Sequence, residues 1–131
     1  MSLLSSDVYT VCAADGDLVA LVGDRIYSTR QPKRTLPNVV FTGPVAWSDM
    51  IYRDNDGAPG RSVVTVQFDC YGSTANEAEE VADAIVALWS GYQSNSPDIG
   101  RAHISNYIND GYGPSLESFR VIVDVDIDIA V

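Results

Sequence analysis

The clearest pattern in the chain is a strand followed almost directly by a helix, between Ser62 and Gly91. From Val64 to Cys70 apolar and polar side chains alternate, which predicts a strand that ends at Gly72 and has one covered face. Thr74 can cap a helix, with Glu77 completing a capping box. The apolar positions of this helix recur every three or four residues, and they are Ala75, Ala78, Val81, Ala82, Ile85, Leu88 and Trp89.

The C-terminal segment from Leu116 to Val131 repeats the alternation over a longer stretch. Its apolar row is Phe119, Val121, Val123, Val125, Ile127 and Ile129, and its polar row contains Arg120, Asp124, Asp126 and Asp128. Two such strands predict an antiparallel sheet that is wet on one face and covered by the helix on the other.

Weaker signals complete the expected fold. Residues 2–14 and 17–23 are predicted as short helices, the first capped by Ser6 or Asp7 and broken by Gly16. Further strands are expected over 37–42, over 45–52 after a turn at Gly43-Pro44, and over 103–108 before a turn at 109–115. The expected fold class is α+β: a mainly antiparallel β-sheet packed on one face by a long helix, with short N-terminal helices, in a single domain over residues 1–131.

Two polar connections, near residues 28–36 and 53–61, are expected to be mobile loops. Arg25, Arg30, Lys33 and Arg34 place four of the eight cationic residues within ten positions. This cluster is either an ordinary solvated loop or a contact patch for an acidic neighbouring subunit. The second connection, Arg53 to Arg61, is rich in Asp, Asn, Gly and Pro, so we expect a hairpin tip that becomes ordered only against a partner.

The composition narrows the possible functions. At 131 residues, with 46% hydrophobic residues, the chain can bury a core without metal or disulfides, so Cys12 and Cys70 are interpreted as small core residues. No segment is apolar enough for a membrane span or a secretory signal, which indicates synthesis in the cytoplasm and no membrane partner. A formal net charge of −10 argues against a surface that grips nucleic acid.

The sequence signals for a catalytic or metal site are weak. Asp124, Asp126 and Asp128 lie at alternate positions, roughly 6.5–7 Å apart along a strand, which is too far for convergence on one cation. His103 is the only histidine, and it is interpreted as a strand or surface residue. No zinc, phosphate-binding or nucleophile motif is present. We therefore expect no cofactor, no metal and no enzymatic activity.

The order of the parts resembles a known family. An N-terminal helix leads to Gly23-Asp24-Arg25-Ile26-Tyr27, then to Pro-Asn-Val-Val-Phe, a long loop, Val-Thr-Val-Gln-Phe-Asp-Cys-Tyr-Gly, a helix from Ala75 to Ile85 and a closing strand. Over nearly the whole chain this order is similar to the tail-terminator and tail-completion proteins of long-tailed bacteriophages and prophages. The Arg25-to-Tyr27 and Gly72-to-Ile85 segments are the most similar parts.

The resemblance implies a structural, non-enzymatic virion protein, assembled in the host bacterial cytoplasm. It implies a homohexameric ring at the head-proximal end of the tail that caps the tail tube and contributes to head-tail joining. The implied partners are copies of the chain itself, the tail tube protein and head-tail connector proteins.

Within such a ring we assign two sets of residues. DNA is expected to pass through the lumen without specific binding, along acidic walls that include Asp124, Asp126 and Asp128. Contacts to other subunits or to the tube are expected from Arg25, Arg30, Lys33, Arg34, Arg53, Asp54, Asp56 and Arg61.

Three alternatives remain open from the sequence. The first is a head-side neck or connector completion protein, which differs from a terminator in its partners. The second is a small acidic metal-binding or enzymatic domain, favoured only by the ladder of aspartates. The third is a cytosolic adaptor domain.

Overall fold

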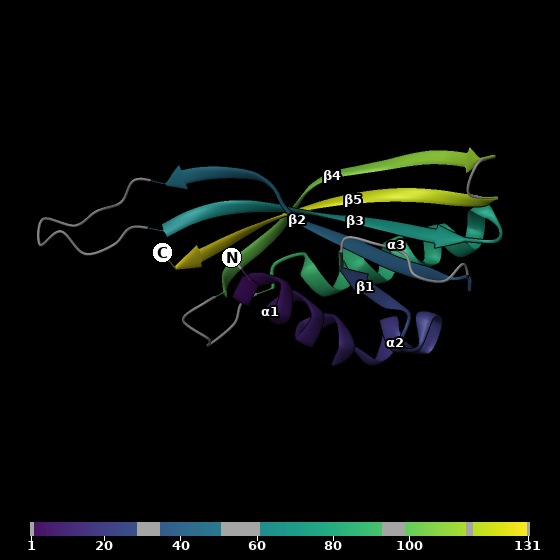
Figure 1. Ribbon diagram of the computed structural model, residues 1–131, viewed down its shortest axis with the longest axis horizontal. Helices are drawn as coiled ribbons and strands as arrows, with labels where there is room; N and C mark the ends of the chain where they lie inside the picture. Colours follow the sequence, from purple (N-terminus) through teal and green to yellow (C-terminus); the bar gives the residue numbers. More distant parts are fainter. Residues whose placement is uncertain (1, 29–34, 51–60, 93–98, 115–116, 131) are drawn as a thin grey trace, which may run out of the picture.

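The computed structural model describes residues 2–28, 35–50, 61–92, 99–114 and 117–130 (Figure 1). These residues form an α+β fold, as predicted. Most of the loops expected near 28–36 and 53–61 falls in 29–34 and 51–60, outside the described residues. The elements, in chain order, are α1 (Ser2–Ala13), α2 (Gly16–Val22), β1 (Ile26–Ser28), β2 (Asn38–Met50), β3 (Arg61–Gly72), α3 (Ala75–Trp89), β4 (Ile99–Gly113) and β5 (Ser118–Ala130).

The strands form one five-stranded sheet in the order β1-β2-β3-β5-β4. All neighbouring pairs are antiparallel except β1 and β2, which run parallel. The sequence pattern did not reveal β1, because three residues are too few to show a period of two. Pairing with Val39, Val40 and Phe41 of β2 makes this short segment a strand.

β2 is a single strand, so the prediction of a turn at Gly43-Pro44 is wrong. Its pairing with β3 continues on both sides of a register shift between Thr42 and Ala46. Proline has no N–H to give to the ladder, and a bulge accommodates it without ending the strand. Gly43 also brings its backbone close to β3, because a Cβ there would lie 2.9 Å from Cγ2 of Val66.

β4 is also longer than the predicted 103–108, since it includes Asn109 to Gly113, where a turn was expected. A register shift between Asn109 and Gly111 absorbs the irregular sequence, and Gly111 adopts a φ of 75°. Glycine reaches this left-handed region without a Cβ penalty, so the strand continues through the bulge.

The long helix α3 agrees closely with its prediction. Thr74 caps it, because its Oγ1 accepts a hydrogen bond from the Glu77 N–H at 3.1 Å. The carboxylate of Glu77 in turn accepts from the N–H of Ser73 at 2.8 Å, so the returning bond reaches Ser73 rather than Thr74. The positive φ of Gly91 follows the end of the helix, as expected for a stop.

The N-terminal helices differ from prediction at their starts. α1 begins at Ser2, so Ser6 and Asp7 lie inside the helix and do not cap it. Gly16 is the first residue of α2, where Asp15 is the N-cap and accepts from the Leu18 N–H at 3.0 Å. No helix among the described residues is both long and apolar enough to cross a membrane.

The core lies between one face of the sheet and the helices (Figure 1). Phe68 is central: its ring centroid lies 6.1 Å from that of Phe41 and 6.0 Å from that of Trp89. Cys12 and Cys70 are free and buried, which confirms their interpretation as core residues. Burial raises the pKa of the Cys12 thiol to about 12, so this side chain stays protonated at neutral pH. The paired ends of β2 and β3 extend beyond the helices (Figure 1).

Candidate functional site

The face of the sheet opposite α3 carries a group of carboxylates that we call the acidic face. On β5, the buried residues Val123, Val125 and Ile127 alternate with half-buried aspartates that point to the opposite side. β3 and β4 each add one aspartate to the same side. The acidic face therefore consists of Asp69, Asp110, Asp124, Asp126 and Asp128.

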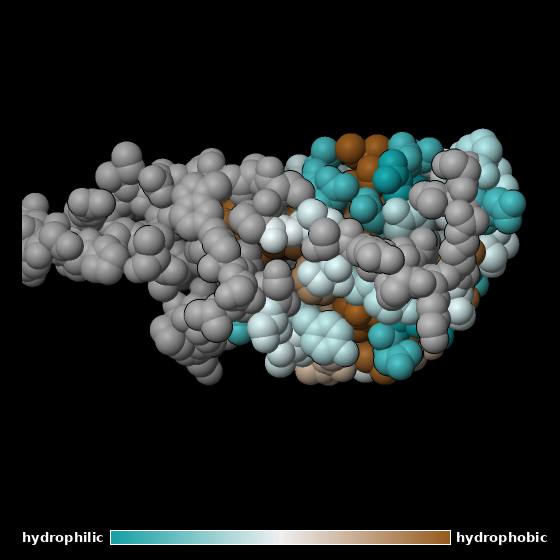
Figure 2. Space-filling view, in the orientation of Figure 1, coloured by the Kyte–Doolittle hydropathy of each residue, from teal (hydrophilic) through white to brown (hydrophobic). Residues whose placement is uncertain are grey.

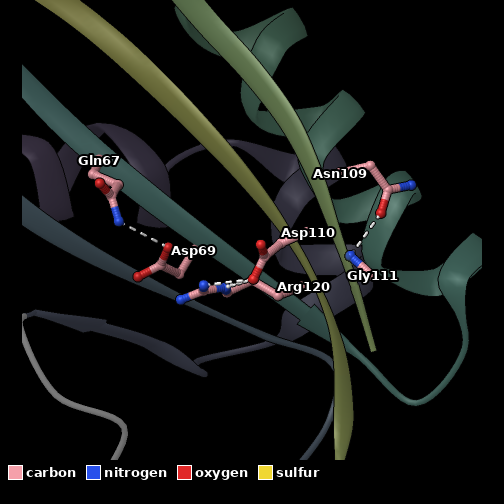
Figure 3. Close-up of polar contacts among 6 residues, drawn as sticks. All are labelled: Gln67, Asp69, Asn109, Asp110, Gly111 and Arg120. Carbon is pink, nitrogen blue, oxygen red and sulfur yellow. Dashed lines mark hydrogen bonds and ion pairs between the residues drawn. The ribbon is translucent and has the colours of Figure 1, made fainter. Parts of the chain in front are cut away.

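Arg120 is the cation within this group. Its Nε donates to Oδ2 of Asp110 at 2.9 Å, and its Nη2 donates to the same oxygen at 2.5 Å. Gln67 donates from Nε2 to Oδ1 of Asp69 at 3.1 Å. Figure 3 shows the Arg120 guanidinium between the carboxylates of Asp110 and Asp69. Three neighbouring strands therefore place their polar groups around one guanidinium.

Asp69 is the most deeply buried of these acids, with 9% of its surface exposed. Burial raises the pKa of its carboxyl group, and the charges of Asp124 and Asp110 raise it further. The hydrogen bond from Gln67 and the charge of Arg120 act in the opposite direction without reversing the shift. A single guanidinium does not offset the desolvation and the neighbouring acids, so the negative charge of Asp69 opposes folding.

The replacement Asp69→Asn is expected to stabilise the fold at neutral pH. Because the pKa of Asp69 is higher in the folded state, the folded chain binds more protons just above pH 3.8, and stability falls as the pH rises through that window. Asparagine keeps an oxygen that can accept from Gln67 but loses the charge.

Thermal unfolding of both proteins between pH 3 and 8 measures this effect. We expect the stability gain of the variant to grow as the pH rises above 3.8, the ordinary pKa of an aspartate. Asp17→Asn, at an exposed position of α2, is the control. A difference between Asp69→Asn and the parent that is the same at every pH would contradict the prediction.

The predicted lumen-facing row occupies the middle of the acidic face. Asp126 accepts from Oγ1 of Thr65 at 2.6 Å, and its other oxygen lies 3.4 Å from Nε2 of His103. Oδ1 of Asp124 is buried and accepts no hydrogen bond from the described residues. The His103 side chain is 67% exposed, which confirms its assignment to the surface of a strand. In the described part of the chain, no three metal-binding side chains are grouped so that they could hold an ion.

The predicted contact residues are separated. Arg25 precedes β1 and donates from Nε to the Pro37 carbonyl at 2.8 Å. Arg61 starts β3 and pairs with Met50, at the far end of β2 from the β1 pairing. The structure therefore places these two at opposite ends of β2 and does not bring them together. The other predicted contact residues, which are Arg30, Lys33, Arg34, Arg53, Asp54 and Asp56, lie outside the described residues.

Sequence reasoning missed Asp69 and Asp110 as parts of the site. Asp69 was visible in the polar row of its strand, but nothing in the pattern joined that row to the row of β5. Asp110 lies in the segment predicted as a turn, so its place on the sheet was hidden. The ion pair with Arg120 requires the register between β4 and β5, which a sequence pattern does not encode.

Comparisons with known proteins agree with this picture. The family model for tail completion protein gp17 matches residues 6–127. A chain from the virion of a native gene transfer agent particle has a similar fold, with a TM-score of 0.76 and 18% identity over 95% of this chain and 92% of that one. A comparison with curated proteins finds no match. Since the family model spans nearly the whole chain, the protein belongs to the tail completion protein gp17 family and is a structural component of the phage virion tail.

Proposed function

We propose that this protein forms a closed ring of identical subunits, a hexamer, at the head-proximal end of the tail tube. There it ends the growth of the tube and contributes to joining the tail to the head. The observation that carries the proposal is the acidic face: one side of the sheet is covered by helices, while the opposite side carries five aspartates and one arginine, Arg120, which pairs with Asp110. The proposed role requires no catalysis and no cofactor.

The acidic face suits a wall past which DNA must move. Phosphate groups adhere to cationic surfaces and are repelled by carboxylates, so an acidic wall lets DNA pass without specific binding. Six copies with a formal charge of −10 each would carry about −60 in total. We therefore assign Asp124, Asp126 and Asp128 to the lumen of the ring.

We assign contacts with other proteins to the two polar connections of the sequence, near residues 28–36 and 53–61, together with Arg25. The stretch from Arg25 to Arg34 contacts a neighbouring subunit, and Arg53, Asp54, Asp56 and Arg61 contact the tail tube protein. The extension of β2 and β3 beyond the helices supports the second assignment, because the strand ends on either side of residues 51–60 lie away from the helices (Figure 1). Connector proteins of the head are the expected partners on the other side of the ring.

A phage that lacks this protein provides the test. We expect tails that vary in length and remain separate from filled heads, and we expect added purified protein to restore joining in an extract. Electron microscopy of the particles measures both properties, and an equal amount of an unrelated acidic protein is the control. Tails of normal length with heads attached, in the absence of this protein, would contradict the proposal.

The same extract distinguishes the second candidate, a head-side connector. The acidic face would suit that role equally well, because DNA passes through both positions. Purified protein that binds isolated tail tubes indicates a terminator. Protein that binds only isolated heads indicates a connector.

A further inference from the structure

We propose that Asp110 masks Arg120 from the phosphate groups of passing DNA, so that the acidic face contains a cation without offering a site for phosphate. The inference deepens the proposed function and rests on it for the path of the DNA, while the masking itself is a property of the single chain. Figure 2 shows hydrophilic side chains, interrupted by a small apolar patch, along the upper margin of the molecule, where Figure 1 places β4 and β5. Asp110 belongs to β4 and Arg120 to β5.

Arg120 is the residue of the acidic face that is able to hold a phosphate. A guanidinium stays charged at every physiological pH, and its planar set of N–H groups matches the oxygens of a phosphate. Burial does not hide this one, because 33% of the Arg120 side chain is exposed. An unpaired guanidinium at this position would therefore give passing DNA a point of attachment among the carboxylates.

Asp110 occupies the groups that a phosphate would use. The Nε and Nη2 groups of Arg120 both donate to Oδ2 of Asp110. Neighbouring N–H groups of this kind form the paired bonds by which arginine binds phosphate. Burial lowers the pKa of Arg120, but the hydrogen bonds with Asp110 and Tyr71 outweigh this effect and raise it. The ion pair therefore stabilises the charged guanidinium and uses its donors at the same time.

Asp69 does not replace Asp110 in this role. It lies on the other side of the guanidinium (Figure 3), and 9% of its surface is exposed. Its Oδ1 accepts a hydrogen bond from Gln67 at 3.1 Å. Asp69 therefore leaves the Nε and Nη2 groups of Arg120 to Asp110.

The backbone of β4 holds Asp110 in place. Asn109 pairs with Val121 of β5, and Gly111 pairs with Arg120. Asp110, between them, is the extra residue of a bulge, and bulges fix the direction of a side chain. Oδ1 of Asn109 accepts from the Gly111 N–H at 3.0 Å, and Gly111 has a φ of 75° (Figure 3). The carboxylate is thus preorganised against the guanidinium, whereas a flexible surface acid would leave it open part of the time.

The variant Asp110→Asn tests the masking on the purified protein. Asparagine keeps the size of the side chain and loses its charge. The probe is inorganic phosphate, titrated at constant ionic strength and neutral pH, and the measurement is the Nε–Hε signal of Arg120 in heteronuclear NMR. We expect phosphate to bind the variant about fivefold more tightly than the parent, or better, because a unit charge a few ångströms away is worth about that factor in water.

Two further variants show whether the gain comes from Arg120. Asp17→Asn loses the same charge at an exposed position of α2, and its affinity for phosphate should stay within about twofold of the parent because distant charges are screened. Asp110→Asn/Arg120→Gln removes both partners, and the gain should disappear. Circular dichroism and thermal unfolding check that each protein is folded, and Asp110→Ser provides the same test if the amide disturbs the fold. Unchanged phosphate binding by the folded Asp110 variant would overturn the inference, and so would a gain that survives the loss of Arg120.

Virions that carry the same variants connect the masking to the passage of DNA. We expect DNA release to slow by about threefold or more with Asp110→Asn, and to recover in the double variant, because phosphates then meet no free cation. An ion pair that serves only to stabilise the sheet predicts no such recovery. Normal release from particles whose isolated Asp110→Asn protein binds phosphate would overturn the role in DNA passage and the assignment of the acidic face to the lumen, although Asp110 would still mask Arg120.

Discussion

Replacement of Gly72 by alanine is expected to destabilise the fold by about 3 kcal/mol or more, at the upper end of the cost of overpacking. Gly72 ends β3 two residues before the N-cap of α3. A Cβ at this position would lie 2.5 Å from the Ala78 nitrogen and 2.9 Å from the Glu77 carbonyl carbon. Both atoms belong to the backbone of the first turn of α3, so the turn itself would have to move.

The expected loss of stability is large because the first turn of α3 positions the buried side chains of the whole helix. α3 supplies the buried Ala78, Val81, Ala82, Ile85 and Trp89, and a shift of its first turn disturbs their packing against β3 and β5. A domain of this size is stable by about 5–15 kcal/mol, so the variant loses a large fraction of its margin. Urea unfolding followed by tryptophan fluorescence measures the loss.

Gly113→Ala is the matched control for this prediction. A Cβ at Gly113 meets only the Ser118 carbonyl oxygen within 4 Å, at 3.8 Å. We expect a change within about 0.5 kcal/mol, as for other substitutions away from close contacts. An equal loss for both variants would show that the contact with α3 is not the cause.

The second large effect concerns the passage of DNA. Particles that carry Asp126→Lys/Asp128→Lys are expected to lose infectivity by about tenfold or more, because ammonium groups on the wall of the lumen would hold phosphates electrostatically. Titre and the rate of DNA release from purified virions measure the effect. Since contacts between ammonium and phosphate weaken with salt, higher ionic strength should partly restore release.

Glu80→Lys/Asp17→Lys controls for overall charge, because it makes the same change at exposed positions of α3 and α2. We expect nearly normal titre from this variant. Equal losses for the two variants would indicate an effect of net charge. Normal titre for the aspartate variant, with the protein present in the particles, would show that the acidic face does not line the path of the DNA.

Local periodicity was enough to determine the central unit of this protein. The alternation from Val64 to Cys70 correctly predicted the strand and its covered face. The helical spacing from Ala75 to Trp89, with Thr74 before it, correctly predicted the helix and its N-cap. The two rows of β5 were equally clear. These patterns are reliable because a long segment with one buried face repeats the same signal at every second residue or every turn of helix.

Other features depended on long-range pairing. β1 is a strand because it lies along β2, and residues 109–113 belong to β4 because β5 holds them there. When such a segment is considered alone, its Asn, Asp and Gly residues predict a turn that ends the strand. A register shift then accommodates them, and nothing in the local sequence indicates that the partner strand will allow it.

The sequence by itself determined the fold class and the acidic character of the chain, because composition and periodicity are properties of each segment separately. The family was indicated by a resemblance in the order of the segments. Only the tertiary structure decided that Asp69 and Asp110 lie on either side of the Arg120 guanidinium and that β1 and β4 are the edges of the sheet. The physical reason is that these relations depend on the order and register of strands far apart in the chain, which are set by packing across the whole sheet.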